Sequence, residues 1–143
     1  MSAIYASALY ADSDETEWII DTAATDHFCN KKELFQNYKE LKNKSATLGE
    51  GNTVICGIGN AVLEIDRNGE KSRLILLNDL HAPHMRRNLI SGRLIDKAGL
   101  TAVRRNKKIN VNYPSGDEMF IAYLKNNFYV LQAKVLKSSS SNL

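Results

Sequence analysis

The sequence has few of the residues that mark several common classes of protein. Its 143 residues include two cysteines, two prolines and one tryptophan. Cys29 and Cys56 cannot form the framework of a disulfide-rich secreted domain, so reduced thiols are expected. The longest apolar runs, such as residues 74–77, are far too short for a membrane-spanning helix. The N-terminus also lacks a basic segment followed by an apolar one, so no secretory signal is expected.

Other absences narrow the possible functions further. The sequence contains no zinc knuckle, P-loop or dinucleotide-binding glycine fingerprint, so we expect no metal and no cofactor. A net charge of +3 is too small to argue by itself for a nucleic-acid partner. Apolar residues make up 43% and charged residues 24% of the chain, as in an ordinary globular protein with one core.

The chain divides into three parts. Residues 1–16 are expected to hold a short strand at 4–10 and an acidic linker, residues 17–135 one folded domain, and residues 136–143 a disordered polar tail. Turn-forming residues separate many short apolar segments, and Asn68-Gly69 suits a tight type I′ hairpin. These segments predict strands at 18–21, 45–48, 53–56, 61–66, 72–77, 100–104, 109–113, 118–123 and 127–132.

Helical signals are sparse. A short helix is expected near residues 31–35, and a second is expected over 92–97 with Gly99 placed to end it. The predicted fold is therefore all-β for the most part, as a closed barrel or a sandwich with one short helix near its C-terminal end.

The most informative segment is Trp18-Ile19-Ile20-Asp21-Thr22-Ala23-Ala24-Thr25-Asp26-His27. A hydrophobic run places one carboxylate at the end of a buried strand, and small residues then allow the backbone to turn tightly around it. This segment resembles the Asp-Thr/Ser-Gly-Ala signature of retropepsins, and with its last three residues it resembles the protease of Ty1/copia-type retrotransposon polyproteins. Three later segments resemble the retropepsin flap tip, the strand leaving it, and the final strand and helix: 48–52, 57–65 and 88–100.

The resemblance implies a retropepsin-like closed β-barrel half that works as a homodimer, and an aspartic endopeptidase that processes its own Gag-Pol polyprotein. One Asp21 from each subunit would form the carboxylate pair that shares a proton and activates water, the arrangement for which aspartic proteases are a standard example. Thr22, Ala23 and Ala24 would support this turn. Ala23 stands where the family usually has glycine, so its methyl group could weaken catalysis.

The resemblance also implies where a polypeptide substrate would bind. Gly49 and Gly51 would let the flap hairpin move and approach the substrate closely. The implied substrate-binding and flap residues are Thr25, Asp26, Leu48, Gly49, Glu50, Gly51, Asn52, Leu89 and Ile90. The implied location is the cytoplasm, within virus-like particles, with no membrane partner.

Three alternatives stay open at this point. The first is a catalytically weakened or inactive dimerisation or scaffold module. The second is a nucleic-acid-binding β domain that uses the basic segments 86–87 and 104–108, although charge clusters at turns are usually only solvated. The third is a zinc site made by His27, Cys29, His81 and His84, whose spacing is not a standard zinc pattern.

Overall fold

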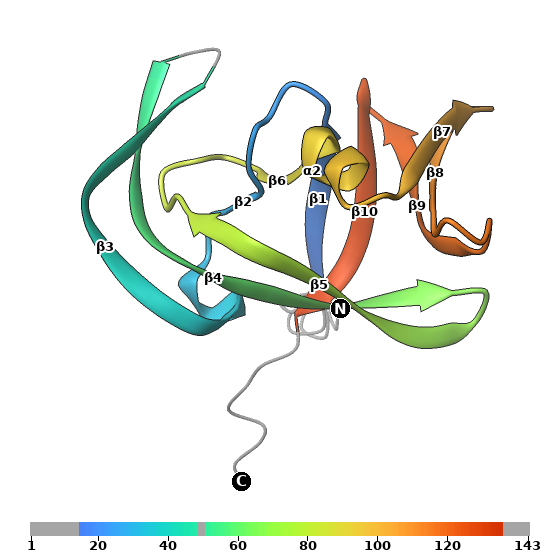
Figure 1. Ribbon diagram of the computed structural model, residues 1–143, viewed down its shortest axis with the longest axis horizontal. Helices are drawn as coiled ribbons and strands as arrows, with labels where there is room; N and C mark the ends of the chain where they lie inside the picture. The colour runs from blue at the N-terminus through green and yellow to red at the C-terminus, as the bar shows by residue number, and fades with distance from the viewer. Residues whose placement is uncertain (1–14, 49–50, 136–143) are drawn as a thin grey trace, which may run out of the picture.

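The computed structural model describes residues 15–48 and 51–135, and nearly all regular structure within them is β-strand. The predicted strand at 4–10 and the predicted tail at 136–143 lie outside these residues. Figure 1 shows the arrangement of the elements. The strands are β1 (Glu15–Asp21), β2 (Phe28–Cys29), β3 (Phe35–Leu48), β4 (Gly51–Arg67), β5 (Glu70–His81), β6 (Asn88–Ser91), β7 (Thr101–Arg105), β8 (Lys108–Asn112), β9 (Glu118–Lys125) and β10 (Phe128–Val135).

The strands form one mixed sheet that curls into a near-barrel. Its order is β3-β4-β5-β2-β6-β1-β10-β9-β8-β7, and an additional pairing of β10 with β4 closes a ring through β4, β5, β2, β6, β1 and β10. The β1–β6 and β2–β5 pairings are parallel, whereas β10 runs antiparallel to β1, β9 and β4. The coarse all-β prediction is therefore confirmed. The predicted homodimer stays a prediction.

The two helical predictions differ in outcome. Helix α2 (Gly92–Lys97) has the predicted bounds, and Gly99 follows it with a φ of 84°, a conformation that glycine adopts without strain. The segment near 31–35 forms only the short 3₁₀ turn η1 (Lys32–Leu34). No helix in the described part of the chain is long and apolar enough to cross a membrane.

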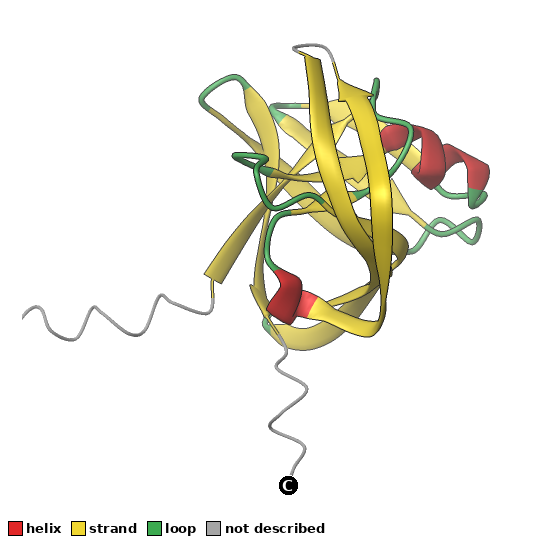
Figure 2. Ribbon diagram, turned by 90° about the vertical axis from the view of Figure 1, so that its left-hand side faces the viewer, coloured by secondary structure: helices red, strands yellow, loops and turns green. Residues whose placement is uncertain are grey.

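The β3–β4 hairpin is much longer than the sequence pattern predicts. The segments 53–56 and 61–66 are parts of one 17-residue strand, β4. β3 begins at Phe35, ten residues before the predicted start, and two register shifts interrupt its pairing with β4. Asn37 and Asn43 have φ values of 55° and 56° within those shifts, which bend the strand. Figure 2 shows this hairpin curving along one side of the barrel, and its tip stands above the body.

Two clusters of buried side chains stabilise the fold. The larger one fills the ring and includes Trp18, Leu63, Ile90 and Val111, each at most 1% exposed. The smaller one lies under the β3–β4 hairpin and consists of Phe28, Ile55 and Ala82, with Leu41, Leu48, Met85 and Leu89 packed against them. The hydrophobic run before Asp21 therefore anchors the chain in the main core.

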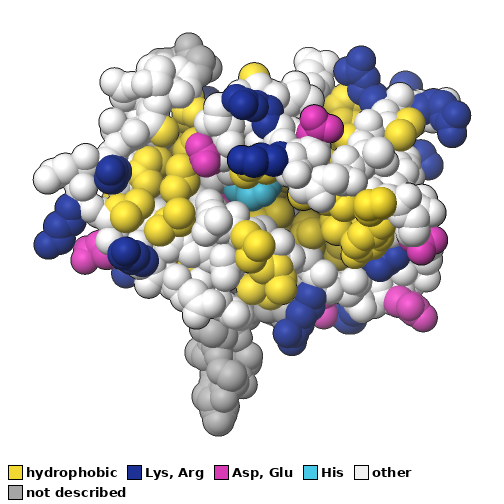
Figure 3. All heavy atoms as spheres, in the orientation of Figure 1, with side chains coloured by type: hydrophobic (Ala, Val, Ile, Leu, Met, Phe, Trp, Pro, Cys, Tyr) yellow, Lys and Arg dark blue, Asp and Glu magenta, His cyan; other side chains and the backbone are white. Residues whose placement is uncertain are grey.

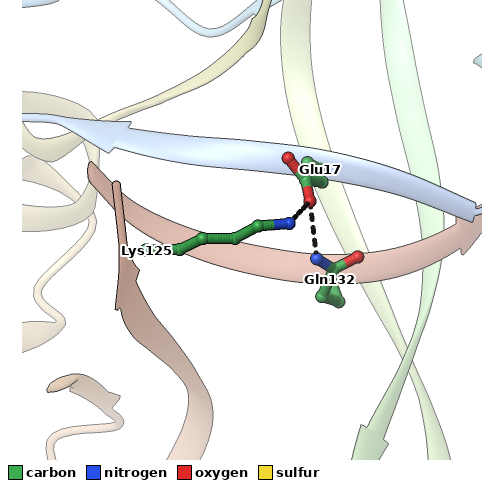
Figure 4. Close-up of polar contacts among 3 residues, drawn as sticks. All are labelled: Glu17, Lys125 and Gln132. Atoms are coloured by element: carbon green, nitrogen blue, oxygen red, sulfur yellow. Dashed lines mark hydrogen bonds and ion pairs between the residues drawn. The ribbon is translucent and has the colours of Figure 1, made fainter. Parts of the chain in front are cut away.

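A surface contact joins β1 to the strands beside it. The carboxylate of Glu17 on β1 accepts hydrogen bonds from Lys125 Nζ at the end of β9 and from Gln132 Nε2 on β10, the latter at 2.8 Å (Figure 4). The hydrogen bond from Lys125, followed by that from Gln132, holds the pKa of Glu17 below its ordinary value. Because both partners are exposed, we expect this contact to contribute little to stability.

One buried carboxyl group has no partner within the described residues. Asp79 on β5 is 0% exposed, neither of its oxygens accepts a hydrogen bond there, and the nearby Leu80 N–H donates instead to His27 O at 2.9 Å. Burial raises the pKa of Asp79 well above its ordinary value. Burial therefore favours the neutral form of this side chain.

We expect Asp79→Asn to stabilise the domain at neutral pH. In the wild type the unfolded chain ionises above a pKa of 3.8 while the folded chain stays protonated, so stability falls as pH rises beyond that value. Asparagine cannot ionise, so the stability gained by Asp79→Asn should grow as pH rises from about 4 toward 7.

Urea unfolding of both proteins between about pH 3 and about pH 7 measures this difference. The gain should be absent at the acidic end and grow with pH. The exposed residue Asp117 provides the control, because Asp117→Asn should change stability by less than about 0.5 kcal/mol. A difference between the two proteins that stays flat with pH would show that Asp79 is not neutral in the fold.

Candidate functional site

A cleft of about 800 Å³ opens where β1 ends. Three segments surround it: the turn at residues 21–25, the tip of the β3–β4 hairpin, and the loop at 84–87 that joins β5 to β6. The described residues that line it are Ile19, Ile20, Asp21, Thr22, Ala23, Ala24, Thr25, Thr47, Leu48, Gly51, Asn52, Thr53, His84, Met85, Arg86, Arg87, Leu89 and Phe128. This volume falls within the range of ordinary ligand-binding sites.

Most of the predicted site residues meet in this cleft. Asp21, Thr22, Ala23, Ala24 and Thr25 form one wall, and Leu48, Gly51, Asn52 and Leu89 lie around them. Two predicted residues do not line it. Asp26 turns its carboxylate toward the Thr25 hydroxyl, which donates to it at 3.0 Å, and Ile90 is buried in the main core. Gly49 and Glu50 lie outside the described residues.

The Asp21 carboxylate closes its own turn. Its Oδ1 accepts a hydrogen bond from the Ala23 N–H at 2.9 Å, and the Ala24 N–H donates to the Asp21 backbone oxygen at 3.3 Å. A carboxylate that accepts from the amide two residues later is a common way to stabilise a tight turn. Among the described residues that line the cleft, Asp21 is the one carboxylate.

His27 and Ser91 hold this turn from below. The Ser91 hydroxyl donates to Ala24 O at 2.6 Å and accepts from the Leu94 N–H at 3.1 Å, so it also caps helix α2. The Ser91 N–H donates to His27 Nδ1 at 2.9 Å. Burial lowers the pKa of His27 to about 4, which keeps the imidazole neutral and able to accept this hydrogen bond at neutral pH.

The opposite wall is fixed by asparagine side chains. Asn30 Nδ2 donates to Met85 O at 3.0 Å, and the Asn30 N–H donates to Asn88 Oδ1 at 2.9 Å. Arg87 then places its guanidinium over the ring of Phe128, 4.6 Å from the ring centre. The loop therefore presents positive charge beside an apolar surface.

The sequence prediction missed this second wall. Arg86 and Arg87 had been considered as a possible nucleic-acid-binding segment or a solvated cluster, and Met85 and Phe128 carried no site prediction. The adjacent pair of arginines was the available signal. Its proximity to Asp21 could not be predicted, because it depends on the parallel pairing of β1 with β6, in which Asp21 lies opposite Ser91.

Three of the four residues of the zinc alternative make other hydrogen-bonding contacts. His27 Nδ1 accepts from Ser91, the Cys29 thiol donates to Lys31 O at 3.5 Å, and His81 Nδ1 lies 2.8 Å from the Tyr38 hydroxyl. Burial raises the pKa of the Cys29 thiol, which disfavours the thiolate that a metal would need. Within residues 15–48 and 51–135, no three His, Cys, Asp or Glu side chains form a metal-binding group.

Comparison with known proteins gives two matches. The family model described as the β-barrel domain of Pol polyproteins matches residues 18–100, more than half of the chain. The chain is also 32% identical over 103 residues to the retrovirus-related Pol polyprotein from transposon TNT 1-94 of Nicotiana tabacum. This alignment covers 70% of the chain but 7% of the tobacco polyprotein, so the chain spans a small part of that relative's length.

These matches correct the functional prediction. The resemblance to a copia-type polyprotein pointed to the right kind of element, but the matching model is a β-barrel domain and not a protease domain. The matched residues include Asp21, α2 and most of the cleft. The assignments as a retropepsin, as an aspartic endopeptidase and as a hydrolase that processes Gag-Pol are therefore wrong.

Proposed function

Because the chain belongs to the family of β-barrel domains of Pol polyproteins, we propose that it is a non-catalytic scaffold module whose cleft holds an extended polypeptide segment. The observation that carries this proposal is the cleft itself, which has fixed walls and an apolar floor. Among the described residues that line the cleft, Asp21 is the one carboxylate, and it accepts a hydrogen bond from the Ala23 N–H of its own turn. In this module Asp21 stabilises the turn.

The floor of the cleft suits apolar side chains of a bound segment. Leu48, Met85 and Leu89 pack on the small core cluster and also line the cleft, and Phe128 is 39% exposed at its edge. Burying such surface is the main favourable contribution to most associations of this kind.

The rim of the cleft adds charge selectivity. Arg86 and Arg87 are exposed, and the contact of Arg87 with Phe128 holds its guanidinium close to the apolar floor. A guanidinium binds a carboxylate through two parallel hydrogen bonds. The preferred segment therefore combines apolar residues with an acidic residue nearby, and its extended backbone lies between the turn at 21–25 and the hairpin tip.

Peptides of about 15 residues, tiled across the tobacco polyprotein, provide the test. We expect a subset that contains acidic and apolar residues to bind in the micromolar range, with amide shift changes in ¹⁵N spectra confined to residues that line the cleft. The double variant Arg86→Gln/Arg87→Gln should weaken this binding by about tenfold, because it removes both charge-assisted contacts.

The matched control removes two cations elsewhere. Lys71 and Arg73 are exposed on β5 outside the cleft, and Lys71→Gln/Arg73→Gln should leave peptide affinity within about twofold. If both double variants weakened peptide binding equally, the loss of affinity would reflect net charge and not specific contacts of Arg86 and Arg87. If no tiled peptide bound, the scaffold proposal would fail.

The other partner predictions remain to be tested. The homodimer, a polypeptide from the same polyprotein, and a cytoplasmic location within particles all stay predictions. A dimer would not use β10 as a free edge strand, because β10 pairs with β1, β9 and β4 within the chain. The two ends of the sheet are instead β3 and β7.

A further inference from the structure

The strands β7, β8 and β9 form the antiparallel end of the sheet, and none of their residues lines the cleft. Register pairs Val103 with Asn110 and Arg105 with Lys108, and on the next strand Lys108 lies opposite Tyr123. Directly opposed residues point to the same side of a sheet. The buried residues Ile109, Val111, Phe120 and Ala122 point to the core. The outer face therefore includes Thr101, Val103, Arg105, Lys108, Asn110, Asn112, Ile121 and Tyr123.

This outer face carries concentrated positive charge. Arg105 and Lys108 lie on this face and Lys107 lies in the β7–β8 turn beside it, whereas Arg104, opposite Ile109, points to the other side of the sheet. In the described part of the chain neither Arg105, Lys107 nor Lys108 takes part in an ion pair. Figure 3 shows basic side chains gathered at the upper right, where Figure 1 places β7 and β8. The acidic residue beside this face, Glu118, lies at one end, where Asn110 Nδ2 approaches its Oε1 at 3.5 Å.

The outer face also carries an aromatic ring and amide side chains, which can contact nucleic-acid bases. Tyr123 is 55% exposed and Val103 is 47% exposed, and Lys108 Nζ lies 5.9 Å from the centre of the Tyr123 ring. A groove of about 470 Å³ passes along Arg105, Lys108, Asn110 and Asn112. The amide side chains offer both donors and acceptors to base edges.

From this combination we propose that the outer face of β7–β9 binds single-stranded nucleic acid. Phosphates contact Arg105 and Lys108, one base stacks on Tyr123, and the asparagines contact the edges of unpaired bases. The charge complementarity selects a polyanion, and the exposed aromatic ring beside the cations favours one whose bases are free to stack. A duplex keeps its bases stacked internally and leaves Tyr123 without a partner. The groove on this face shares no lining residue with the cleft, so this proposal does not depend on the scaffold proposal.

Fluorescence anisotropy with a labelled oligouridine of about 15 nucleotides tests the proposal. We expect binding to single-stranded RNA or DNA at least about tenfold tighter than to a duplex of equal length. Arg105→Gln/Lys108→Gln should weaken binding by about tenfold or more, and should lower the slope of log affinity against log salt by about 1.4, since each phosphate contact contributes about 0.7. Tyr123→Ser should weaken binding by about fivefold or more with the salt slope unchanged.

The control is Lys42→Gln/Lys44→Gln, which removes two exposed cations from β3 and should change affinity by less than about twofold. All substituted side chains are at the surface, and circular dichroism is used to check that each variant is folded. Three results would each overturn the proposal. The two double variants could lose affinity equally, the duplex could bind as tightly as the single strand, or the Tyr123→Ser variant could bind as well as the wild type. Displacement of the RNA by poly-glutamate at the same charge concentration would overturn it too, and would assign the face to acidic polypeptides.

Discussion

Trp18→Ala is expected to lower the free energy of unfolding by about 3–5 kcal/mol, a large share of the stability of a domain of this size. Trp18 is 0% exposed in the main core, so the truncation leaves a cavity that the surrounding strands cannot fill. It also removes the indole N–H that donates to Thr16 Oγ1 at 3.0 Å. Since Thr16 Oγ1 in turn donates to Ala133 O at 3.1 Å, the loss extends to the β1–β10 pairing.

Urea unfolding followed by circular dichroism measures this loss. Trp18→Phe keeps most of the apolar volume and should cost clearly less, because only the hydrogen bond and part of the ring are removed. Val103→Ala at an exposed position should change stability by about 0.5 kcal/mol or less. A Trp18→Ala protein that loses under about 1 kcal/mol would contradict the central place of Trp18 in the core.

Ser91→Ala is expected to cost about 2–4 kcal/mol and to loosen the wall of the cleft that contains Asp21. The substitution removes a hydroxyl that donates to Ala24 O and accepts from the Leu94 N–H, at a residue with 0% exposure. Two backbone groups then lose their partner, and α2 loses its N-terminal cap. The backbone contact from Ser91 to His27 remains, so the neighbouring histidine should keep its place.

Thermal unfolding and ¹⁵N amide spectra together test this prediction. The amide signals of residues 22–25 should shift or broaden, whereas those of β7–β9 should not change. Ser115→Ala is the control, because Ser115 is exposed and, among the described residues, its hydroxyl makes one hydrogen bond, accepted from the Asp117 N–H at 3.3 Å. Destabilisation without any change at residues 22–25 would mean that Ser91 serves only helix α2.

Local signals predicted the short-range features of the fold well. Asn68 and Gly69 both have positive φ, as a type I′ hairpin requires, and Asp66 accepts from the Gly69 N–H at 2.9 Å. The bounds of α2 and the role of Gly99 were also predicted from residues within a few positions. In each case the residues that determine the structure are neighbours in the sequence.

The long strands could not be predicted, because their features depend on tertiary contacts. The predicted strands 53–56 and 61–66 left out Gly57 and Gly59, yet both lie inside β4. At Gly57 a Cβ atom would lie 2.1 Å from the Tyr38 ring, and at Gly59 it would lie 2.9 Å from the Gln36 oxygen. The glycines allow β3 to approach closely. Residues 36–44 of β3 are mostly polar and lack a strand-like alternation, so pairing with β4 determines their conformation.

Most of the predicted site residues line one cleft, but the protease chemistry assigned to them was wrong. A buried strand that ends in a carboxylate and small residues predicts a tight turn at the surface, and that turn lines the cleft. The same few residues suit either a catalytic carboxylate or one that accepts from its own turn, as Asp21 does from the Ala23 N–H. Sequence spacing alone does not distinguish the two roles.

The closure of the ring has a consequence for how the domain folds during synthesis. Thr16 bonds to Ala133 across 117 positions of sequence, and the β4–β10 pairing that completes the ring involves Lys134 and Val135. At a synthesis rate of roughly 5–20 residues per second, β1 waits roughly 6–25 s for its partner strand to be translated. Folds rich in such distant contacts form slowly. During that interval the Trp18–Ile20 run is exposed in the nascent chain, so chaperones have their greatest opportunity to bind there before β10 emerges.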